Sequence, residues 1–170
     1  MPPEQPVRPM RWREGTLELL DQTLLPAEER WIRCETHEDV AEAIERLAVR
    51  GAPSIGLATA YGWVVGLNAG ADPAAIEKRL AATRPTAVNL RFALERMRSV
   101  GSESSAALAL AEEMARERAE EDGRIAEAGA ALFKPGDRAL THCNAGPLAT
   151  AGAGTAGGVL AAAHAAGRLE

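Results

Sequence analysis

The chain has 170 residues, of which 46% are hydrophobic and 25% charged, and its formal net charge is −5. This length predicts one domain, or one domain with part of a second, and the composition excludes wholesale disorder. The negative charge argues against binding to nucleic acid or anionic membranes, and no apolar stretch approaches the roughly 18 residues that span a bilayer.

Residues 1–9 are rich in proline and polar groups and lack the apolar run of a secretory signal. We therefore expect a flexible arm at the start of a cytoplasmic protein. Short strands are predicted next, because residues 11–13 and 16–20 flank a Glu14-Gly15 turn and residues 30–34 form a third candidate. These segments indicate a small antiparallel sheet.

Helices are predicted from Thr36 onward. Thr36 can cap a helix that keeps apolar residues at the helical period up to Val49. A second helix, from Ser54 to about Leu67, is apolar nearly all round and is therefore expected to be buried. Further helices are expected from Asp72, from Thr86, and from Ser102 to about Glu121, with a weak point at Gly123 before the pattern resumes over 125–133.

The pattern changes at Lys134. Residues 138–143 read as a short buried strand, and a glycine-rich stretch then leads to a helix from about Ala156 to Ala166. We expect an α+β N-terminal domain, a small antiparallel sheet plus a helical bundle over residues 10–134, followed over 135–170 by the first strand–loop–helix unit of a Rossmann-like α/β domain. Because one strand cannot form a stable parallel sheet, the chain is expected to be truncated.

Cysteine and histidine are too scattered to indicate a disulfide framework or a structural metal site. Cys34 and Cys143 lie far apart, and the three histidines are equally dispersed. We expect no metal, and we interpret Cys34, on a predicted strand, as a structural residue.

Two arginines directly precede helix starts marked by proline, Arg50 before Gly51-Ala52-Pro53 and Arg84 before Pro85. Free N–H groups at a helix start favour an anion, and a guanidinium adds a planar fork of donors that suits phosphate. The alternative is an ordinary helix junction with a solvated arginine. These residues taken alone favour this alternative over an anion site.

Cys143 stands at the expected end of the strand, beside a loop that contains glycine. In open α/β folds ligands bind at that edge of the sheet, where helix starts and arginines can lower a thiol pKa. A small buried apolar residue is an equally good interpretation. His142 should point to the opposite face of the strand, so we interpret it as structural.

Gly152, Gly154 and Gly157 spell G-x-G-x-x-G. A dinucleotide fingerprint would follow its strand directly, and here an extra loop intervenes, so the signal is weak. Close packing of the helix against the strand explains the same small residues.

Four segments together resemble the methylthioribose-1-phosphate isomerase family, which is related to the regulatory subunits of the translation-initiation guanine-nucleotide exchange factor. They are V-R-G-A-P-S-I-G at 49–56, R-P-T-A-V-N-L at 84–90, T-H-C-N-A-G at 141–146 and G-A-G-T-A-G-G at 152–158. The resemblance runs from Met10 to the end of the chain.

The resemblance implies an aldose–ketose isomerase of methionine salvage, which converts 5-methylthioribose 1-phosphate to 5-methylthioribulose 1-phosphate without metal or organic cofactor, usually as a homodimer. It also implies that Arg50, Gly51, Ala52 and Arg84 contact the sugar phosphate and that Cys143 is the active-site cysteine. The family's essential aspartate lies downstream of T-H-C-N-A-G, in a part that this chain lacks, so we expect the isolated chain to be inactive.

Three alternatives remain open at this point. The chain is compatible with a non-catalytic regulatory subunit of the related exchange-factor family, and with an isomerase that acts on ribose 1,5-bisphosphate. The glycine motif keeps open a dinucleotide-dependent enzyme.

Overall fold

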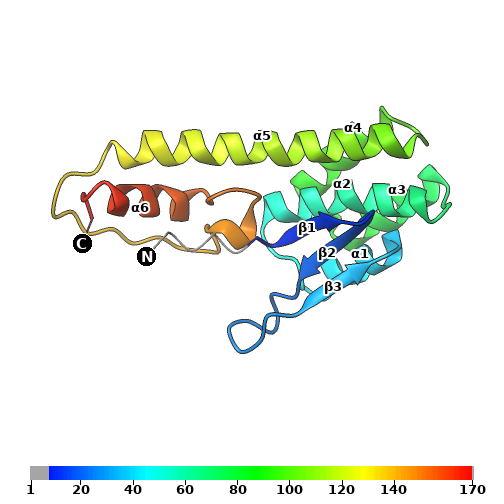
Figure 1. Cartoon of the computed structure of the whole chain (residues 1–170), viewed down its shortest axis with the longest axis horizontal. Coiled ribbons are helices and arrows are strands. Elements are labelled where there is room, and N and C mark those ends of the chain that lie inside the picture. Colours follow the sequence, from blue (N-terminus) through cyan, green and yellow to red (C-terminus); the bar gives the residue numbers. More distant parts are fainter. Residues whose placement is uncertain (1–7, 170) are drawn as a thin grey trace.

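The computed structural model describes residues 8–169, which form a small sheet and a set of helices (Figure 1). The elements are β1 (Met10–Arg13), β2 (Thr16–Leu20), β3 (Trp31–Cys34), α1 (His37–Glu45), α2 (Ala52–Asn68), α3 (Pro73–Thr83), α4 (Val88–Arg98), α5 (Ser104–Ala130), the short 3₁₀ helix η1 (Pro147–Ala149) and α6 (Ala156–Ala165). The helix α5 runs along the long axis, with the sheet and α1–α3 at one end and α6 at the other. No helix within the described range is long and apolar enough to cross a membrane.

The predicted antiparallel sheet is confirmed, with strand order β1-β2-β3. Glu14 and Gly15 both have positive φ, at 51° and 76°, as a tight two-residue hairpin turn requires. The expected flexible arm does not extend to Pro9, because Pro9 is buried and its carbonyl oxygen accepts a hydrogen bond of 2.9 Å from the Leu20 N–H. The rest of the expected arm, residues 1–7, lies outside the described residues.

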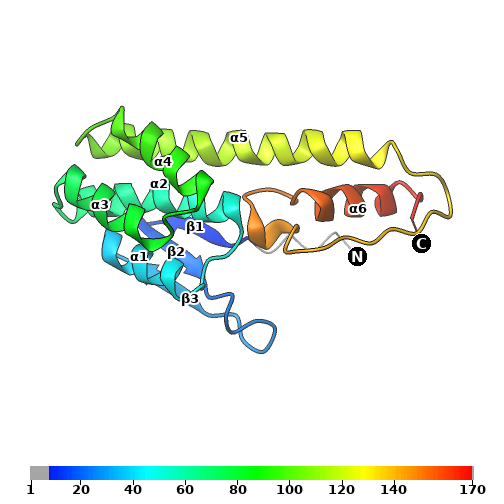
Figure 2. The same cartoon turned by 180° about the vertical axis from the view of Figure 1, so that it is seen from behind.

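The apolar helix α2 forms the centre of the helical layer, as its sequence predicts. It packs against α1, α3, α4 and α5, and seen from behind it is covered by α1, α3 and α4 (Figure 2). Trp63 on α2 is only 1% exposed. The rings of Trp12 on β1 and Tyr61 on α2 stack with 5.6 Å between their centroids, which joins the sheet to this core. The core therefore fixes where α2 begins, and the start of α2 is the part that matters for the site.

The capped start predicted at Thr36 is confirmed. The hydroxyl of Thr36 accepts a hydrogen bond from the Asp39 N–H, and the Asp39 carboxylate accepts one of 2.8 Å from the Thr36 N–H. This reciprocal arrangement satisfies two donors that would otherwise lack partners at the helix start.

The helix α5 does not break at Gly123, contrary to the sequence-based expectation. It continues as one helix to Ala130, and its second half lies alongside α6 (Figures 1 and 2). Val159 of α6 packs so closely on Gly129 that an added Cβ would lie 2.6 Å from a Val159 methyl carbon. Burial of small residues along this contact outweighs the ~1 kcal/mol that one exposed glycine costs in a helix.

The buried strand expected over 138–143 is not formed. Leu140 is 90% exposed, and Asp137 with Leu169 makes the sole strand-type bridge outside the main sheet among residues 8–169, in parallel orientation. The backbone of 138–143 has no neighbouring strand in this range with which to form a ladder. A Rossmann-like sheet is therefore not present in the described part of the chain.

The core can be tested by a cavity-creating substitution. Leu80 on α3 has no exposed surface, so Leu80→Ala should lower the free energy of unfolding by about 2–5 kcal/mol. Leu132→Ala removes the same atoms from a side chain that is 82% exposed, and it should change stability by less than about 0.5 kcal/mol. Urea unfolding followed by far-UV circular dichroism measures both. Equal losses in the two variants would contradict the assignment of Leu80 to the core.

Candidate functional site

One open hollow of about 610 Å³ lies between the start of α2, the end of α3 and the segment that leads into α6. Its lining comes from three parts of the sequence that are distant from one another, around 47–53, at 84 and within 143–155. The residues are Leu47, Arg50, Gly51, Ala52, Pro53, Arg84, Cys143, Asn144, Ala145, Ala149, Thr150 and Thr155. The start of α2 and η1, which the sequence separates by almost the whole helical domain, lie side by side in both views (Figures 1 and 2).

All five residues that the sequence analysis assigned to a substrate site line this single hollow. Arg50, Gly51 and Ala52 form one wall, Arg84 directly follows α3 as its C-cap, and Cys143 lies on the loop opposite. The structure thus places together residues that the sequence alone could connect only through a family resemblance.

The hollow is positively charged, although the chain as a whole carries a net charge of −5. Its lining includes the guanidinium groups of Arg50 and Arg84 and no carboxylate among residues 8–169. Within this same range neither arginine forms an ion pair. Two guanidinium groups without counter-ions make the hollow suited to an anion with two or more negative oxygens.

Two helix starts add backbone donors to the same region. Gly51 precedes α2 and Thr155 precedes α6, and neither helix start receives a side-chain capping bond. The first N–H groups of a helix carry partial positive charge and lack intrahelical partners. An anion in the hollow would therefore meet backbone dipoles as well as arginine side chains.

Gly51 permits the close approach that shapes the hollow. Its φ is +97°, a conformation that side chains disfavour, and an added Cβ would lie 2.5 Å from the Cβ of Ala149. No other residue type satisfies both conditions at this position. The start of α2 thereby comes into direct contact with η1, and the two walls of the hollow meet.

Cys143 is exposed, which rules out its interpretation as a buried apolar residue. Its φ is +66°, in the left-handed region that costs a residue with a side chain roughly 1–2 kcal/mol. Strain of this kind is concentrated at functional sites. His142, which we interpreted as structural, is also exposed and does not line the hollow, because the strand that would have buried it is not formed.

The glycine motif acts in packing. An added Cβ on Gly154 would lie 2.5 Å from the carbonyl oxygen of Ala145, and one on Gly157 would lie 2.9 Å from the same oxygen. These glycines hold the loop after Cys143 against the start of α6. The observed contacts match the packing interpretation and leave the dinucleotide interpretation without support.

The sequence analysis missed several lining residues that belong to no charged motif. Ala149 and Thr150 enter the hollow through η1, and Leu47 does so just before Arg50. Only Thr155 carried a usable signal, because a threonine immediately before an alanine-rich helix is a typical N-cap.

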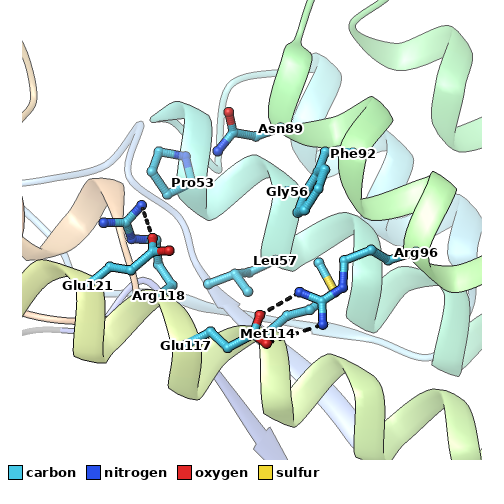
Figure 3. Close-up of a pocket in the computed structure, with 10 residues that line it drawn as sticks. All are labelled: Pro53, Gly56, Leu57, Asn89, Phe92, Arg96, Met114, Glu117, Arg118 and Glu121. Atoms are coloured by element: carbon cyan, nitrogen blue, oxygen red, sulfur yellow. Dashed lines mark hydrogen bonds and ion pairs between the residues drawn. The ribbon is translucent and has the colours of Figure 1, made fainter.

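A second hollow, of about 170 Å³, lies between α2, α4 and α5 and has the opposite character (Figure 3). Its two arginines are neutralised, since Arg96 pairs with Glu117 and Arg118 pairs with Glu121 at 2.9 Å. Arg118 also pairs with the buried Asp122 at 2.7 Å. Because these guanidinium groups already have carboxylate partners, this hollow offers no free positive charge to an anionic ligand.

Comparison with known proteins identifies relatives of two kinds. Residues 48–169 match the Initiation factor 2 subunit family. A methylthioribose-1-phosphate isomerase of Pelotomaculum thermopropionicum is 49% identical over an aligned span of 178 residues. The match covers 94% of this chain and 49% of the relative. This chain therefore spans about half the length of the curated relatives that it matches.

Two solved structures are similar to this fold. The crystal structure of 5-methylthioribose 1-phosphate isomerase from Pyrococcus horikoshii OT3 has a TM-score of 0.86 and 33% identity, covering 97% of this chain and 51% of that one. The crystal structure of the translation initiation factor eIF-2B subunit delta from A. fulgidus has a TM-score of 0.81 and 39% identity, covering 96% and 53% respectively.

A thiol titration of the native chain separates the two cysteines. Cys34 has no exposed surface, and burial together with the charge of Asp39 raises the pKa of its thiol to about 12. Because the thiolate is the nucleophile, Cys34 should not react with an aromatic disulfide reagent at pH 8, whereas the exposed Cys143 should. Cys143→Ser should abolish the rapid reaction and Cys34→Ser should leave it intact. Rapid reaction of both thiols in the folded chain would show that β3 is not buried as described.

Proposed function

This chain belongs to the Initiation factor 2 subunit family, and from that premise we propose that it forms the phosphate-binding part of an aldose–ketose isomerase. The proposed reaction converts 5-methylthioribose 1-phosphate to 5-methylthioribulose 1-phosphate, a step of methionine salvage. The observation that carries the proposal is the hollow in which Arg50, Arg84 and Cys143 meet without any carboxylate among residues 8–169.

The phosphate is the part of the substrate that this hollow suits best. A phosphate monoester carries close to two negative charges, and the forked donors of Arg50 and Arg84 match its oxygens in charge and geometry. Gly51 and Ala52 would let the ester approach the backbone N–H groups at the start of α2. Such anchoring holds the sugar in register, and proximity of this kind contributes several kcal/mol to catalysis.

The reaction also needs an acid. The anomeric carbon carries the phosphate ester, so the ring opens only when a group protonates the ring oxygen, after which hydrogen moves from C2 to C1. We assign assistance of that transfer to the thiol of Cys143, which lines the hollow. No carboxyl group lines the hollow within residues 8–169, so the acid has to come from outside this range. On this proposal the described residues bind substrate but do not turn it over.

The proposal extends to the organisation of the protein. We propose that residues 10–134 form one domain and that residues 135–170 begin a Rossmann-like domain. The parallel bridge between Asp137 and Leu169, with α6 between its two ends, is the connection that a strand–helix–strand crossover would make. The family resemblance supports a cytoplasmic homodimer that uses no metal or organic cofactor.

The similarity to the eIF-2B delta subunit favours a second candidate, a non-catalytic regulatory subunit of the related exchange-factor family. A scaffold needs neither two arginines that form no ion pair within residues 8–169 nor an exposed, strained thiol in the same hollow. These features favour the isomerase, and binding of a sugar phosphate discriminates between the two. Ribose 1,5-bisphosphate, tested alongside, addresses the alternative substrate.

Protection of the Cys143 thiol measures that binding. Added 5-methylthioribose 1-phosphate should slow the reaction of Cys143 with a thiol reagent, because both would occupy the hollow. Arg84→Ala should weaken the protection roughly 10- to 100-fold, as expected for loss of hydrogen bonds to a charged group worth about 1.5–3 kcal/mol. Arg84→Lys keeps the charge, and its protection should lie between that of the unaltered chain and that of Arg84→Ala. Arg124→Ala, at an exposed position of α5, is the matched control and should have no effect. Protection that survives Arg84→Ala in full would remove this arginine from the site.

A fusion of this chain to the part of the Pelotomaculum isomerase that it does not cover tests the reaction itself. The fusion should convert the sugar phosphate, and the chain alone should not. In the fusion, Cys143→Ser should lower kcat by about 100-fold or more with little change in KM, because the thiol acts on the reacting atoms and not on the phosphate. A Cys143→Ser fusion with normal kcat would exclude the thiol from the mechanism.

A further inference from the structure

Two buried polar side chains lie directly behind the wall that η1 contributes to the hollow. The side-chain amide of Gln22 donates a hydrogen bond of 3.0 Å to the carbonyl oxygen of Leu148. The hydroxyl of Ser54 lies 3.2 Å from this same oxygen and 3.4 Å from the carbonyl oxygen of Thr150, so it can donate to either. The strip Leu148–Thr150 is thus held by side chains from the N-terminal half of the chain.

The same two residues are also fixed to the opposite wall of the hollow. The backbone N–H of Gln22 donates a bond of 3.0 Å to the carbonyl oxygen of Ala48, two residues before Arg50. Ser54 belongs to the first turn of α2, directly after the lining residues Ala52 and Pro53. Each of the two residues therefore connects the wall that carries Arg50 with the wall formed by η1.

From η1 the connection continues back along the chain to Cys143. The N–H of Ala149 donates to the Gly146 carbonyl oxygen at 3.1 Å, and the Ala145 carbonyl oxygen accepts a bond of 3.0 Å from the N–H of Gly157 in α6. The loop after Cys143 is therefore fixed to both η1 and α6. The position of the Leu148–Thr150 strip is therefore linked to that of the residues directly after Cys143.

Burying these two polar side chains has a cost in free energy. Gln22 is 2% exposed and Ser54 has no exposed surface. The side-chain carbonyl oxygen of Gln22 is buried and has no hydrogen-bond partner within the described residues. A buried amide with an unsatisfied oxygen costs free energy that an apolar side chain of similar size would not cost. The benefit of the pair lies in the directed bonds, which fix one register between two segments.

We propose that Gln22 and Ser54 are positioning residues that set the separation between the wall with Arg50 and the wall formed by η1 together with the loop that carries Cys143. The importance of this separation for catalysis rests on the proposed function, because the separation decides whether the thiol reaches a sugar whose phosphate is held by arginine. The positioning itself is a property of the free chain and can be measured without any ligand.

Spin labels provide that measurement. One label goes on the native Cys143, which is exposed, and the other on Lys78→Cys at an exposed position of α3, while the buried Cys34 stays unlabelled. Gln22→Met keeps the length of the side chain without its donors, and Ser54→Ala removes the hydroxyl. Each change alone should broaden the distribution of label–label distances, and the two together should about double its width, because the η1 strip then samples other positions.

Ser99→Ala is the matched control, since it removes an exposed hydroxyl that donates to the Arg96 carbonyl oxygen far from η1, and it should leave the distribution unchanged. Far-UV circular dichroism and the thermal midpoint of each variant show whether the chain is still folded. If the double variant fails to fold, the two single variants, measured separately, carry the test. A distribution that stays as narrow as that of the unaltered chain in folded variants would overturn the proposal.

The result of the spin-label experiment does not depend on the proposed function. If sugar phosphate never protects the thiol of the unaltered chain, the function fails, while a broadened distance distribution would still establish the positioning role. In the fusion protein, Gln22→Met and Ser54→Ala should lower kcat more than they raise KM, because the phosphate keeps its arginines while the thiol loses its fixed place. A change in KM alone would contradict this.

Discussion

The candidate site depends on the contact between Gly51, which directly precedes α2, and the 3₁₀ helix η1. Gly51 lies so close to Ala149 that a single added carbon would overlap it, and the positive φ of Gly51 directs the chain into α2. Without this contact the wall with Arg50 and the loop with Cys143 would belong to separate surfaces. The polar bonds from Gln22 and Ser54 then convert close contact into one fixed arrangement.

Charge distinguishes the candidate site from the second hollow, in which both arginines are neutralised. Many of the described arginines pair with nearby carboxylates, as Arg79 does with Glu38 and Glu45 and as Arg96 does with Glu117. Arg50 and Arg84 line one hollow, and neither has such a partner among residues 8–169. An acidic protein that leaves two guanidinium groups uncompensated at one place retains electrostatic free energy there, which an anionic ligand would release.

The core explains why the site can be built from distant segments. The helix α2 is buried on nearly every side, so the direction and position of its N-terminus are set by the packing of four other helices. The long helix α5 continues past that packing and supports α6, whose start lies beside the hollow. Two helices anchored in one framework thus direct their N-termini to the same region, which suits them to hold a phosphate together.

The sequence by itself determined the local elements and the chemistry of single residues. Hydrophobic period and capping residues predicted the sheet, α1, the buried α2 and the start of α6, because these signals act within a few residues. The arginines at helix starts were visible for the same reason. Tertiary structure alone decided that Arg50, Arg84 and Cys143 share one hollow, since that depends on contacts between segments far apart in the chain. It also decided that α5 continues through Gly123, where packing on α6 outweighs local propensity, and that residues 138–143 stay exposed, because a strand needs a neighbour that no local pattern supplies.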